Sequence, residues 1–407
     1  MSSFNMSIYL AISLLLSLFS TKVMKKANLP HVTGYLIAGL LIGPYCFKIL
    51  PSHVVEKFAI IPDIALAFIA FSIGAEFKYS FLKEAGKVPI IIAIFEGLGG
   101  SAFVILALIL TGYDPAFAIV LGAIASATAP AATLMVVRQY QARGPVTDTL
   151  LPVVALDDIV AIVSFNIAVA AARAINNVES VPLAATILDP IVEIGGAVLL
   201  GALMGICLNA IINLFTDSSL QLAASVGVVL LCSGIAQQIG ASQLLACMIM
   251  GAFVVNLSSK SAEVFAEVNQ FTPPIFMLFF FTSGANLNIT ILPAVGVIGI
   301  IYIIFRVIGK LVGTMMGAYL THAETKVKKY LGFTLVPQAG VAIGLAAMAM
   351  KVVPAYGPQI QTIVLAATVI YELIGPVITK IALQKAGEIP AGVEMGKQLS
   401  MDGVLPN

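Results

Sequence analysis

Charged residues are scarce in this chain. Asp, Glu, Lys and Arg make up 10% of its 407 residues, against about 25% in ordinary soluble domains. Apolar residues make up 60%. This composition excludes an ordinary soluble domain and indicates an all-α polytopic membrane protein embedded in a lipid bilayer. The net charge is +1, and the basic residues are scattered over short loops, so no basic face is available to bind nucleic acid.

Cysteine is sparse too. Cys46, Cys207, Cys232 and Cys247 lie within or at the edges of apolar stretches, and no two form a CxxC pair. Such cysteines are typical of small buried residues rather than of a metal or redox site, so we expect no resident cofactor. We also expect no cleavable leader. The first apolar run, residues 6–19, is followed by three lysines and lacks a small-residue cleavage site, which predicts a first membrane helix.

Apolar segments long enough to cross the hydrocarbon core recur along the chain. They predict thirteen transmembrane helices, at residues 5–21, 31–50, 58–77, 88–112, 115–138, 146–173, 187–215, 219–239, 242–256, 264–284, 290–320, 329–350 and 358–385. The ninth is short and the tenth carries Pro273 and Pro274. A count that differs by one therefore stays open.

Loop charges orient these spans. One side has only Lys48, Lys57, Arg173 and Lys351. The other side holds fifteen basic residues, namely Lys22, Lys25, Lys26, Lys78, Lys83, Lys87, Arg138, Arg143, Lys260, Lys326, Lys328, Lys329, Lys380, Lys385 and Lys397. The positive-inside rule makes the richer side cytoplasmic. We therefore expect a plasma (inner) membrane protein with its N-terminus outside and its C-terminus in the cytoplasm.

Two adjacent aspartates, Asp157 and Asp158, lie in the middle of the sixth predicted span. A charge at the bilayer centre costs roughly 2.5 to 3.5 kcal/mol on insertion scales, so a pair of them indicates function. Successive helical residues point about 100° apart, so one carboxylate can face an ion pathway while the other faces a neighbouring helix. An intramembrane aspartyl protease needs two aspartates that approach each other, usually from different helices. Adjacent positions therefore disfavour that enzyme.

Proline interrupts two predicted spans near their middles. Pro130 follows Ser126 and Thr128 in the fifth span, and Pro337 follows Thr334 in the twelfth. Each proline frees a backbone carbonyl, and unwound backbone at that depth must line a cavity or be buried in protein. Spans four to six and eleven to thirteen correspond in order, and each set ends in a helix with an acidic centre. Their offset of seven spans predicts inverted repeats, the architecture of secondary transporters.

Four stretches of the chain resemble the monovalent cation:proton antiporters of the Kef and NapA type. They are Ala-Thr-Ala-Pro-Ala-Ala at 127–132, Ala-Leu-Asp-Asp at 155–158, Gly-Lys-Leu-Val-Gly at 309–313 and Phe-Ser-Ile-Gly-Ala-Glu-Phe at 71–77. The resemblance runs from about residue 5 to 385. It implies a NapA/NhaA-like fold with two crossing broken helices, a homodimer, and exchange of Na⁺, Li⁺ or K⁺ for protons by an elevator movement.

The resemblance also implies a division of the transmembrane domain, residues 1–386. The core or transport part is expected at 58–173 and 264–385, the dimerisation part at 1–57 and 187–256, and a short cytoplasmic tail at 387–407. Members of the potassium-efflux branch look different, because they have Gln-Asp where this chain has Asp157-Asp158.

The expected chemistry is competition at one carboxylate. A carboxylate in a narrow polar cavity holds either a proton or a small cation, and alternate exposure to the two sides then suffices for exchange. We expect Asp158 to bind the transported Na⁺, the only metal predicted. Oxygens of Ser126, Thr128 and the unwound backbone would complete the shell, because hard cations prefer oxygen.

Two basic residues are candidate partners for Asp157. Arg306 and Lys310 lie four residues apart in the eleventh span and therefore on one face. Lys310 follows the Gly-Lys-x-x-Gly pattern of sodium-transporting members, whereas Arg306 resembles the arginine motif of electroneutral exchangers. A buried lysine can lose its proton and an arginine effectively cannot, which favours Lys310. Arg306 would then neutralise Glu372 of the thirteenth span. Glu96 in the fourth span has no assigned partner and is a candidate to contact the ion route.

Three alternatives in substrate or class stay open. A K⁺/H⁺ antiporter needs only a change in cavity dimensions. The second alternative is a channel, and the third is an organic-anion transporter on a similar scaffold. Anionic substrates favour half-helix N-termini and basic walls, whereas both proline breaks here adjoin acidic centres.

Overall fold

The computed structural model describes residues 5–75, 77–79, 86–175 and 183–390. Most of the predicted tail, together with Lys83 and Lys397, lies outside these residues. Helices and loops make up the described part, and no strand occurs in it. The predicted all-α class is therefore confirmed.

The helices follow the predicted apolar segments closely. They are α1 (Met6–Lys26), α2 (His31–Ile42), α3 (Ser52–Lys57), α4 (Ile60–Gly74), α6 (Val88–Leu110), α7 (Pro115–Ile124), α8 (Pro130–Tyr140), α9 (Pro145–Ile175), α10 (Leu183–Leu214), α11 (Ser218–Ile239), α12 (Gln243–Leu257), α13 (Ser261–Phe271), α14 (Pro273–Asn286), the 3₁₀ helix η1 (Ile289–Val295), α15 (Gly296–Leu320), α16 (Thr325–Thr334), α17 (Gly340–Val352) and α18 (Gly357–Ala386).

Seven of the described helices are long and apolar enough to cross a bilayer, namely α1, α6, α9, α10, α11, α15 and α18. The pair α13 and α14, bent by 48°, makes an eighth. The bend falls at Thr272, just before two prolines that cannot continue the ladder of the preceding helix. Further apolar helices, such as α2, α4 and α12, are shorter. The grouping of all of them into thirteen crossings stays a prediction.

The fifth and the twelfth predicted spans are both interrupted. In the first, α7 ends at Ile124 and α8 begins at Pro130. Proline suits the first position of a helix, where its missing N–H would have had no partner. In the second, α16 ends at Thr334 and α17 begins at Gly340, beyond Pro337. The prolines thus separate half-helices rather than kink continuous ones.

The two breaks cross and hydrogen bond to each other. The Ala129 N–H donates to the Pro337 carbonyl over 2.9 Å. The Gln338 amide donates to the Ile124 carbonyl over 3.1 Å, and the Thr133 hydroxyl donates to the Thr334 carbonyl over 3.1 Å. Each break therefore satisfies part of the polar backbone that the other exposes, which is required of irregular backbone in lipid.

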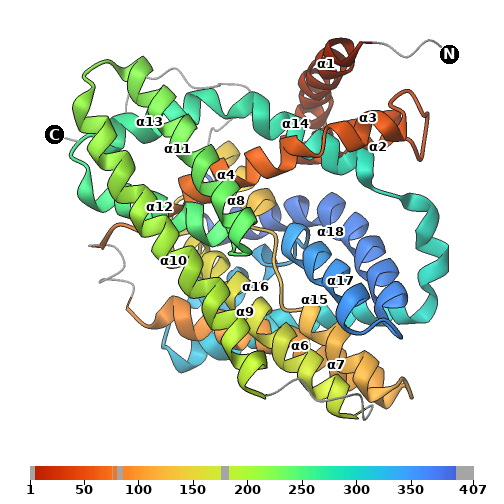
Figure 1. Cartoon of the computed structure of the whole chain (residues 1–407). Helices are drawn as coiled ribbons and strands as arrows, with labels where there is room; N and C mark the ends of the chain where they lie inside the picture. The colour runs from red at the N-terminus through yellow and green to blue at the C-terminus, as the bar shows by residue number, and fades with distance from the viewer. Residues whose placement is uncertain (1–4, 76, 80–85, 176–182, 391–407) are drawn as a thin grey trace.

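The helices pack in two groups. In the first, α6 and α15 make the most extensive contact, and α7, α9, α16 and α18 pack on one or both of them. In the second, α10 packs on α12, α12 on α4, and α14 on α2. Figure 1 shows α10, α11 and α12 on the left of the molecule and α17 and α18 on the right.

The main contacts of α4 and α14 run to helices of the expected dimerisation part. The expected division gives residues 58–77 and 264–284 to the transport part, and in the structure α4 packs mainly on α12 and α14 mainly on α2. Glycines explain this packing. A Cβ on Gly74 would lie 2.2 Å from the Met248 carbonyl oxygen, and one on Gly39 would lie 1.9 Å from the Phe281 oxygen. Such close backbone approach fixes each helix pair.

A glycine seam also holds α6 against α15. A Cβ on Gly99 would lie 2.6 Å from the Gly309 carbonyl oxygen, and one on Gly313 would lie 2.1 Å from the Phe95 oxygen. Only residues without side chains permit this approach. The seam brings Glu96 on α6 against Lys310 on α15.

The segment after the last helix closes onto the start of α9. The Glu388 carboxylate accepts hydrogen bonds from the Val146 N–H (2.7 Å), the Thr147 N–H (2.8 Å) and the Thr147 hydroxyl (2.7 Å). An anion at a helix N-terminus satisfies free N–H groups and complements the helix dipole. Lys380 near the end of α18 donates to the Asn28 carbonyl over 2.5 Å. The residues after α18, the loop after α1 and the start of α9 therefore lie on one face of the molecule.

Candidate functional site

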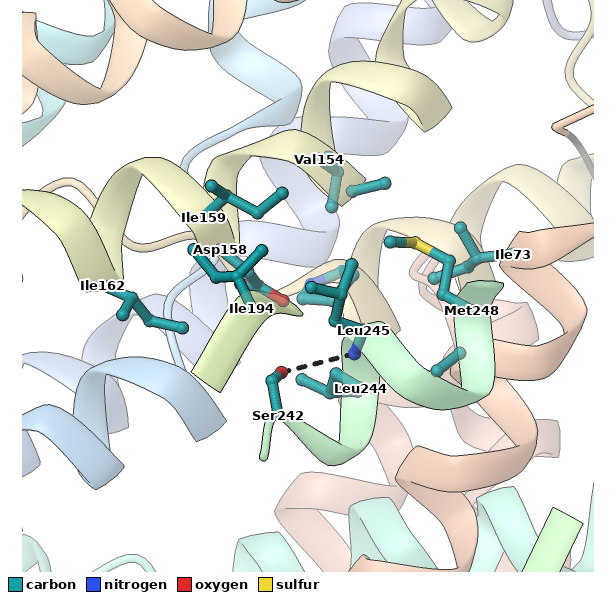
Figure 2. Close-up of a pocket in the computed structure, with 13 residues that line it drawn as sticks. Ile73, Val154, Asp158, Ile159, Ile162, Ile194, Ser242, Leu244, Leu245 and Met248 are labelled. Atoms are coloured by element: carbon teal, nitrogen blue, oxygen red, sulfur yellow. Dashed lines mark hydrogen bonds between the residues drawn. The ribbon is translucent and has the colours of Figure 1, made fainter. Parts of the chain in front are cut away.

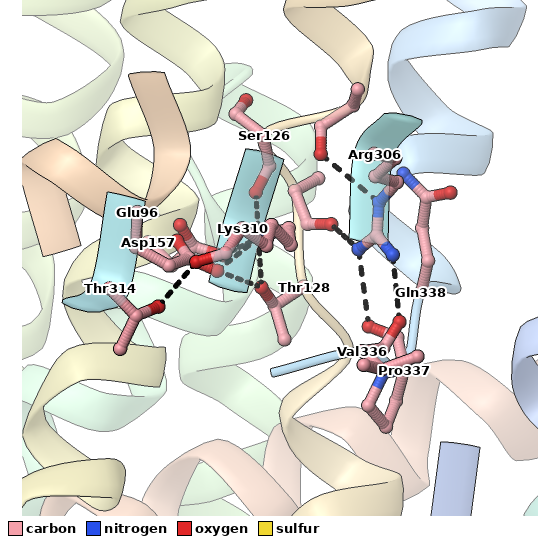
Figure 3. A network of polar contacts seen from close by, with 12 residues as sticks. Glu96, Ser126, Thr128, Asp157, Arg306, Lys310, Thr314, Val336, Pro337 and Gln338 are labelled. Carbon is pink, nitrogen blue, oxygen red and sulfur yellow. Dashed lines mark hydrogen bonds and ion pairs between the residues drawn. The ribbon is translucent and has the colours of Figure 1, made fainter. Parts of the chain in front are cut away.

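Lys310 lies at the centre of a buried polar network (Figure 3). Its ammonium forms ion pairs with Glu96 and, over 3.5 Å, with Asp157. It also donates to the Thr128 hydroxyl (2.8 Å) and the Ser126 carbonyl oxygen (2.6 Å). The side chains of Lys310, Glu96 and Asp157 are fully buried. With both acids ionised the network has a formal charge of −1, so it can accept one further proton or cation.

Arg306, one turn earlier on α15, has different partners. Its guanidinium donates to four carbonyl oxygens. These belong to Ala125 (3.1 Å), Ala127 (2.7 Å), Val336 (2.7 Å) and Pro337 (3.5 Å). All four carbonyls lie in the unwound breaks just after α7 and α16, where helix dipoles leave partial negative charge. Arg306 also lies 4.5 Å from the centre of the Tyr371 ring, a favourable cation–π distance.

The expected pairing of Arg306 with Glu372 does not occur. Within the described part of the chain, Glu372 forms no ion pair or hydrogen bond, although the residue is buried, with only 5% of its surface exposed. The reason is that the freed carbonyls of two crossing breaks already supply Arg306 with acceptors. Glu372 instead lines a separate cavity on the other side of the crossing, with Pro130 and Gly340.

Asp158 and Asp157 point to different neighbours, as their helical offset predicts. Asp158 lines a recess between α9 and the second helix group, with about 410 Å³ of empty space. Figure 2 shows its carboxylate among Ile159 of the same helix, Leu245 of α12 and Ser242, the residue just before α12. Its Oδ1 atom is buried and has no hydrogen-bond partner in the described structure. A buried carboxylate oxygen without a partner is costly unless it binds a proton or a cation.

The shell expected around Asp158 is not assembled in this structure. The Thr128 hydroxyl contacts Lys310, and lies 3.5 Å from a Glu96 oxygen. The Ser126 hydroxyl donates to the Ala123 carbonyl over 2.6 Å, which satisfies a carbonyl at the end of its own half-helix. Both residues thus serve the lysine network and the break, whereas the Asp158 recess offers Ser242 as its other side-chain oxygen among the described lining residues.

Sequence reasoning gave Glu96 no partner, yet it is the second acid of the lysine network. A signal was present in the sequence. Gly97, Gly99 and Gly100 adjoin Glu96, and Gly309 and Gly313 flank Lys310. Two glycine clusters, each beside a buried charge, are the pattern expected of two helices that pack closely and pair their charges.

Comparison with proteins of known family agrees with this geometry. The family described as "Sodium/hydrogen exchanger, transmembrane" matches residues 11–385. Two curated relatives come from Methanocaldococcus jannaschii. "Probable Na(+)/H(+) antiporter 3" is 35% identical over 82 residues, 19% of this chain and 21% of its own length. "Na(+)/H(+) antiporter 1" is 28% identical over 200 residues, 48% of this chain and 45% of its own length. The matched stretches thus span less than half of either relative.

Solved structures show the same fold. The sodium proton antiporter MjNhaP1 from Methanocaldococcus jannaschii at pH 8 superposes with a TM-score of 0.72 at 19% identity, covering 96% of this chain and 99% of its own. An electron-microscopy structure of MjNhaP1 gives a TM-score of 0.72 at 20% identity, covering 95% and 96%. Because the family match extends over nearly the whole chain, this protein belongs to the transmembrane sodium/hydrogen exchanger family.

Proposed function

We propose that this protein exchanges a monovalent cation, Na⁺ in the first place, for protons across a membrane, and that both ions compete for Asp158. The observation that supports this most is the buried Oδ1 of Asp158, which lines a recess without any hydrogen-bond partner. A proton or a small cation would each satisfy that oxygen, and the two cannot be bound together. The names of the curated relatives, both Na⁺/H⁺ antiporters, point in the same direction.

Lys310 would couple a second charge to this exchange. It holds Asp157, the neighbour of Asp158, and shares its ammonium with Glu96. When Na⁺ binds near Asp158, the added positive charge disfavours the lysine ammonium, and the lysine can then release a proton. On this proposal more than one proton crosses per cation and transport carries net charge.

Alternating access would come from movement of one helix group against the other. We place the boundary of the moving unit at α6–α9 and α15–α18, because α4 and α14 pack mainly outside it. The recess at Asp158 lies between this unit and α10 and α12. In our proposal the chain crosses the membrane thirteen times with inverted repeats, the end of α18 is cytoplasmic, and the helices outside the moving unit form a homodimer.

The lining of the recess disfavours an organic anion as substrate. Its described residues comprise one carboxylate, one hydroxyl and otherwise apolar side chains, with no basic residue. An anion would therefore meet a negative charge and no cation. K⁺ in place of Na⁺ differs only in ion size and remains the alternative substrate.

The test is Asp158→Asn in proteoliposomes that carry a proton gradient. A neutral amide cannot trade a proton for a cation, so the dissipation of the gradient by added Na⁺ should fall to the level of empty liposomes. Asp148→Asn makes the same chemical change in the first turn of the same helix and should leave the rate unchanged. Choline, K⁺ and Li⁺ arms identify the cation. Near-normal Na⁺-driven proton movement in Asp158→Asn would refute the assignment.

A further inference from the structure

Glu372 faces a second cavity at the crossing of the broken helices. The cavity has about 350 Å³ of empty space. Its walls include the starts of two half-helices, at Pro130 of α8 and Gly340 of α17. Only 5% of the surface of Glu372 is exposed, and its side chain has neither a hydrogen bond nor an ion pair among the described residues. A carboxylate in this state is not explained by packing alone.

No charged side chain on the neighbouring helices, as far as the structure describes them, pairs with Glu372. The helices packed against α18 are α2, α8, α9, α15, α16, α17 and η1. Their titratable and charged side chains that the structure describes, with those of α18 itself, are His31, Tyr35, Arg138, Tyr140, Asp148, Asp157, Asp158, Arg173, Tyr302, Arg306, Lys310, Tyr319, Lys326, Lys328, Lys329, Tyr330, Tyr371, Lys380 and Lys385. None of them forms an ion pair or a hydrogen bond with Glu372. The nearest in sequence, Tyr371, donates its hydroxyl to the Ile303 carbonyl.

The chemistry of this cavity suits a proton rather than a metal cation. A monovalent cation needs several oxygen ligands, and Glu372 supplies the only side-chain oxygens among the described lining residues. The remaining polar groups include N–H donors of the first turns of α8 and α17, which carry partial positive charge. These donors repel a cation but stabilise an ionised carboxylate, so Glu372 can exist in both protonation states.

The cavity also lies between the two helix groups. On one side are α8, α17 and α18 of the unit proposed to move. On the other are Leu66 of α4, Leu244 of α12, and Phe279 and Phe280 of α14. Movement of one group past the other would carry Glu372 along this apolar wall. An ionised carboxylate without a partner would be destabilised there, whereas a protonated one would not.

We propose that Glu372 is a second proton-binding site, separate from Asp158, and that it must hold a proton for the transport unit to move. The proposal rests on the exchange function proposed above. It assigns Glu372 a proton that controls movement, in addition to the proton that competes with the transported cation.

Exchange of ²²Na⁺ for unlabelled Na⁺ in proteoliposomes isolates this role. In this assay Asp158 carries Na⁺ in both directions across the membrane, so it does not need to bind a proton. In the wild type this exchange should be lost as the pH becomes alkaline and Glu372 ionises. Glu372→Gln mimics the protonated form permanently, so the alkaline loss should disappear. Thr368→Val, a buried polar-to-apolar change one turn away on α18, should keep the wild-type profile. An alkaline loss that persists unchanged in Glu372→Gln would overturn the proposal.

A spectroscopic measurement tests the site without transport. Infrared difference spectra between acid and alkaline pH report carboxyl groups that titrate. The carboxyl difference bands of Asp158→Asn should contain one component that is missing from Asp158→Asn/Glu372→Gln, with both variants checked for a folded, monodisperse state in detergent. If the double variant does not fold, Glu372→Asp should retain the band at a shifted position. Identical spectra for the single and double variants would refute Glu372 as a proton site, whereas failure of Na⁺ exchange with the band intact would refute only the proposed exchange.

Discussion

Arg306 and Lys310 lie one turn apart on the same face of α15, but their surroundings are opposite in kind. Arg306 is bound by backbone carbonyls, whose partial charges are fixed by the course of the chain. Lys310 is bound by two carboxylates, a hydroxyl and one backbone carbonyl, and the charges of the carboxylates change with protonation. The difference teaches that burial alone does not make a cation functional. A cation held by fixed dipoles maintains a structure, whereas one held by titratable groups can take part in a cycle.

Arg306→Gln should have the largest effect, on folding. It leaves up to four buried carbonyls without their donor, and each unsatisfied buried group costs roughly 1–3 kcal/mol. Folded yield and thermal stability in detergent should therefore fall severely, with Arg306→Lys only partly restoring them because one ammonium cannot span both breaks. A well-folded Arg306→Gln protein that has lost transport would reverse the comparison.

Lys310→Gln should leave a folded protein that no longer carries net charge. Glu96 and Asp157 lose their ammonium, but each can become neutral by binding a proton, so the penalty is smaller than for stranded carbonyls. The expected result is a thermal stability well above that of Arg306→Gln and a transport current on a supported membrane reduced to background. An unchanged current would show that the Lys310 proton does not move during the cycle.

Thr128→Ala should have the smallest effect. It removes one hydroxyl from the Lys310 ammonium, a contact of 2.8 Å, and a hydrogen bond to a charged group contributes about 1.5–3 kcal/mol. If that contact orients the network for ion binding, the apparent KM for Na⁺ should rise several-fold with little change in maximal rate. Ser126→Ala is the matched control, since the Ser126 hydroxyl bonds within its own half-helix. Equal KM values for the two variants would remove Thr128 from the site.

The sequence predicted the features that depend on local pattern. The helix limits follow apolar length, the breaks follow Pro130 and Pro337, and the divergence of Asp157 from Asp158 follows helical geometry. What could not be predicted depends on contacts between distant segments. The acceptors of Arg306 exist only because two breaks cross and expose carbonyls to the same guanidinium. Hydropathy does not encode which helices share a glycine seam, so the packing of α4 and α14 could not be derived from it.

The ion pair between Glu96 and Lys310 joins residues 214 positions apart, and this separation has a consequence for biogenesis. At about 5–20 residues per second of synthesis, Glu96 would leave the ribosome roughly 10 to 40 s before Lys310. During that interval its helix must reside in the membrane without the lysine, and a protonated, neutral acid is the form that the bilayer tolerates. Each newly made molecule would therefore begin with a protonated Glu96, which would release its proton only when α15 inserts beside α6.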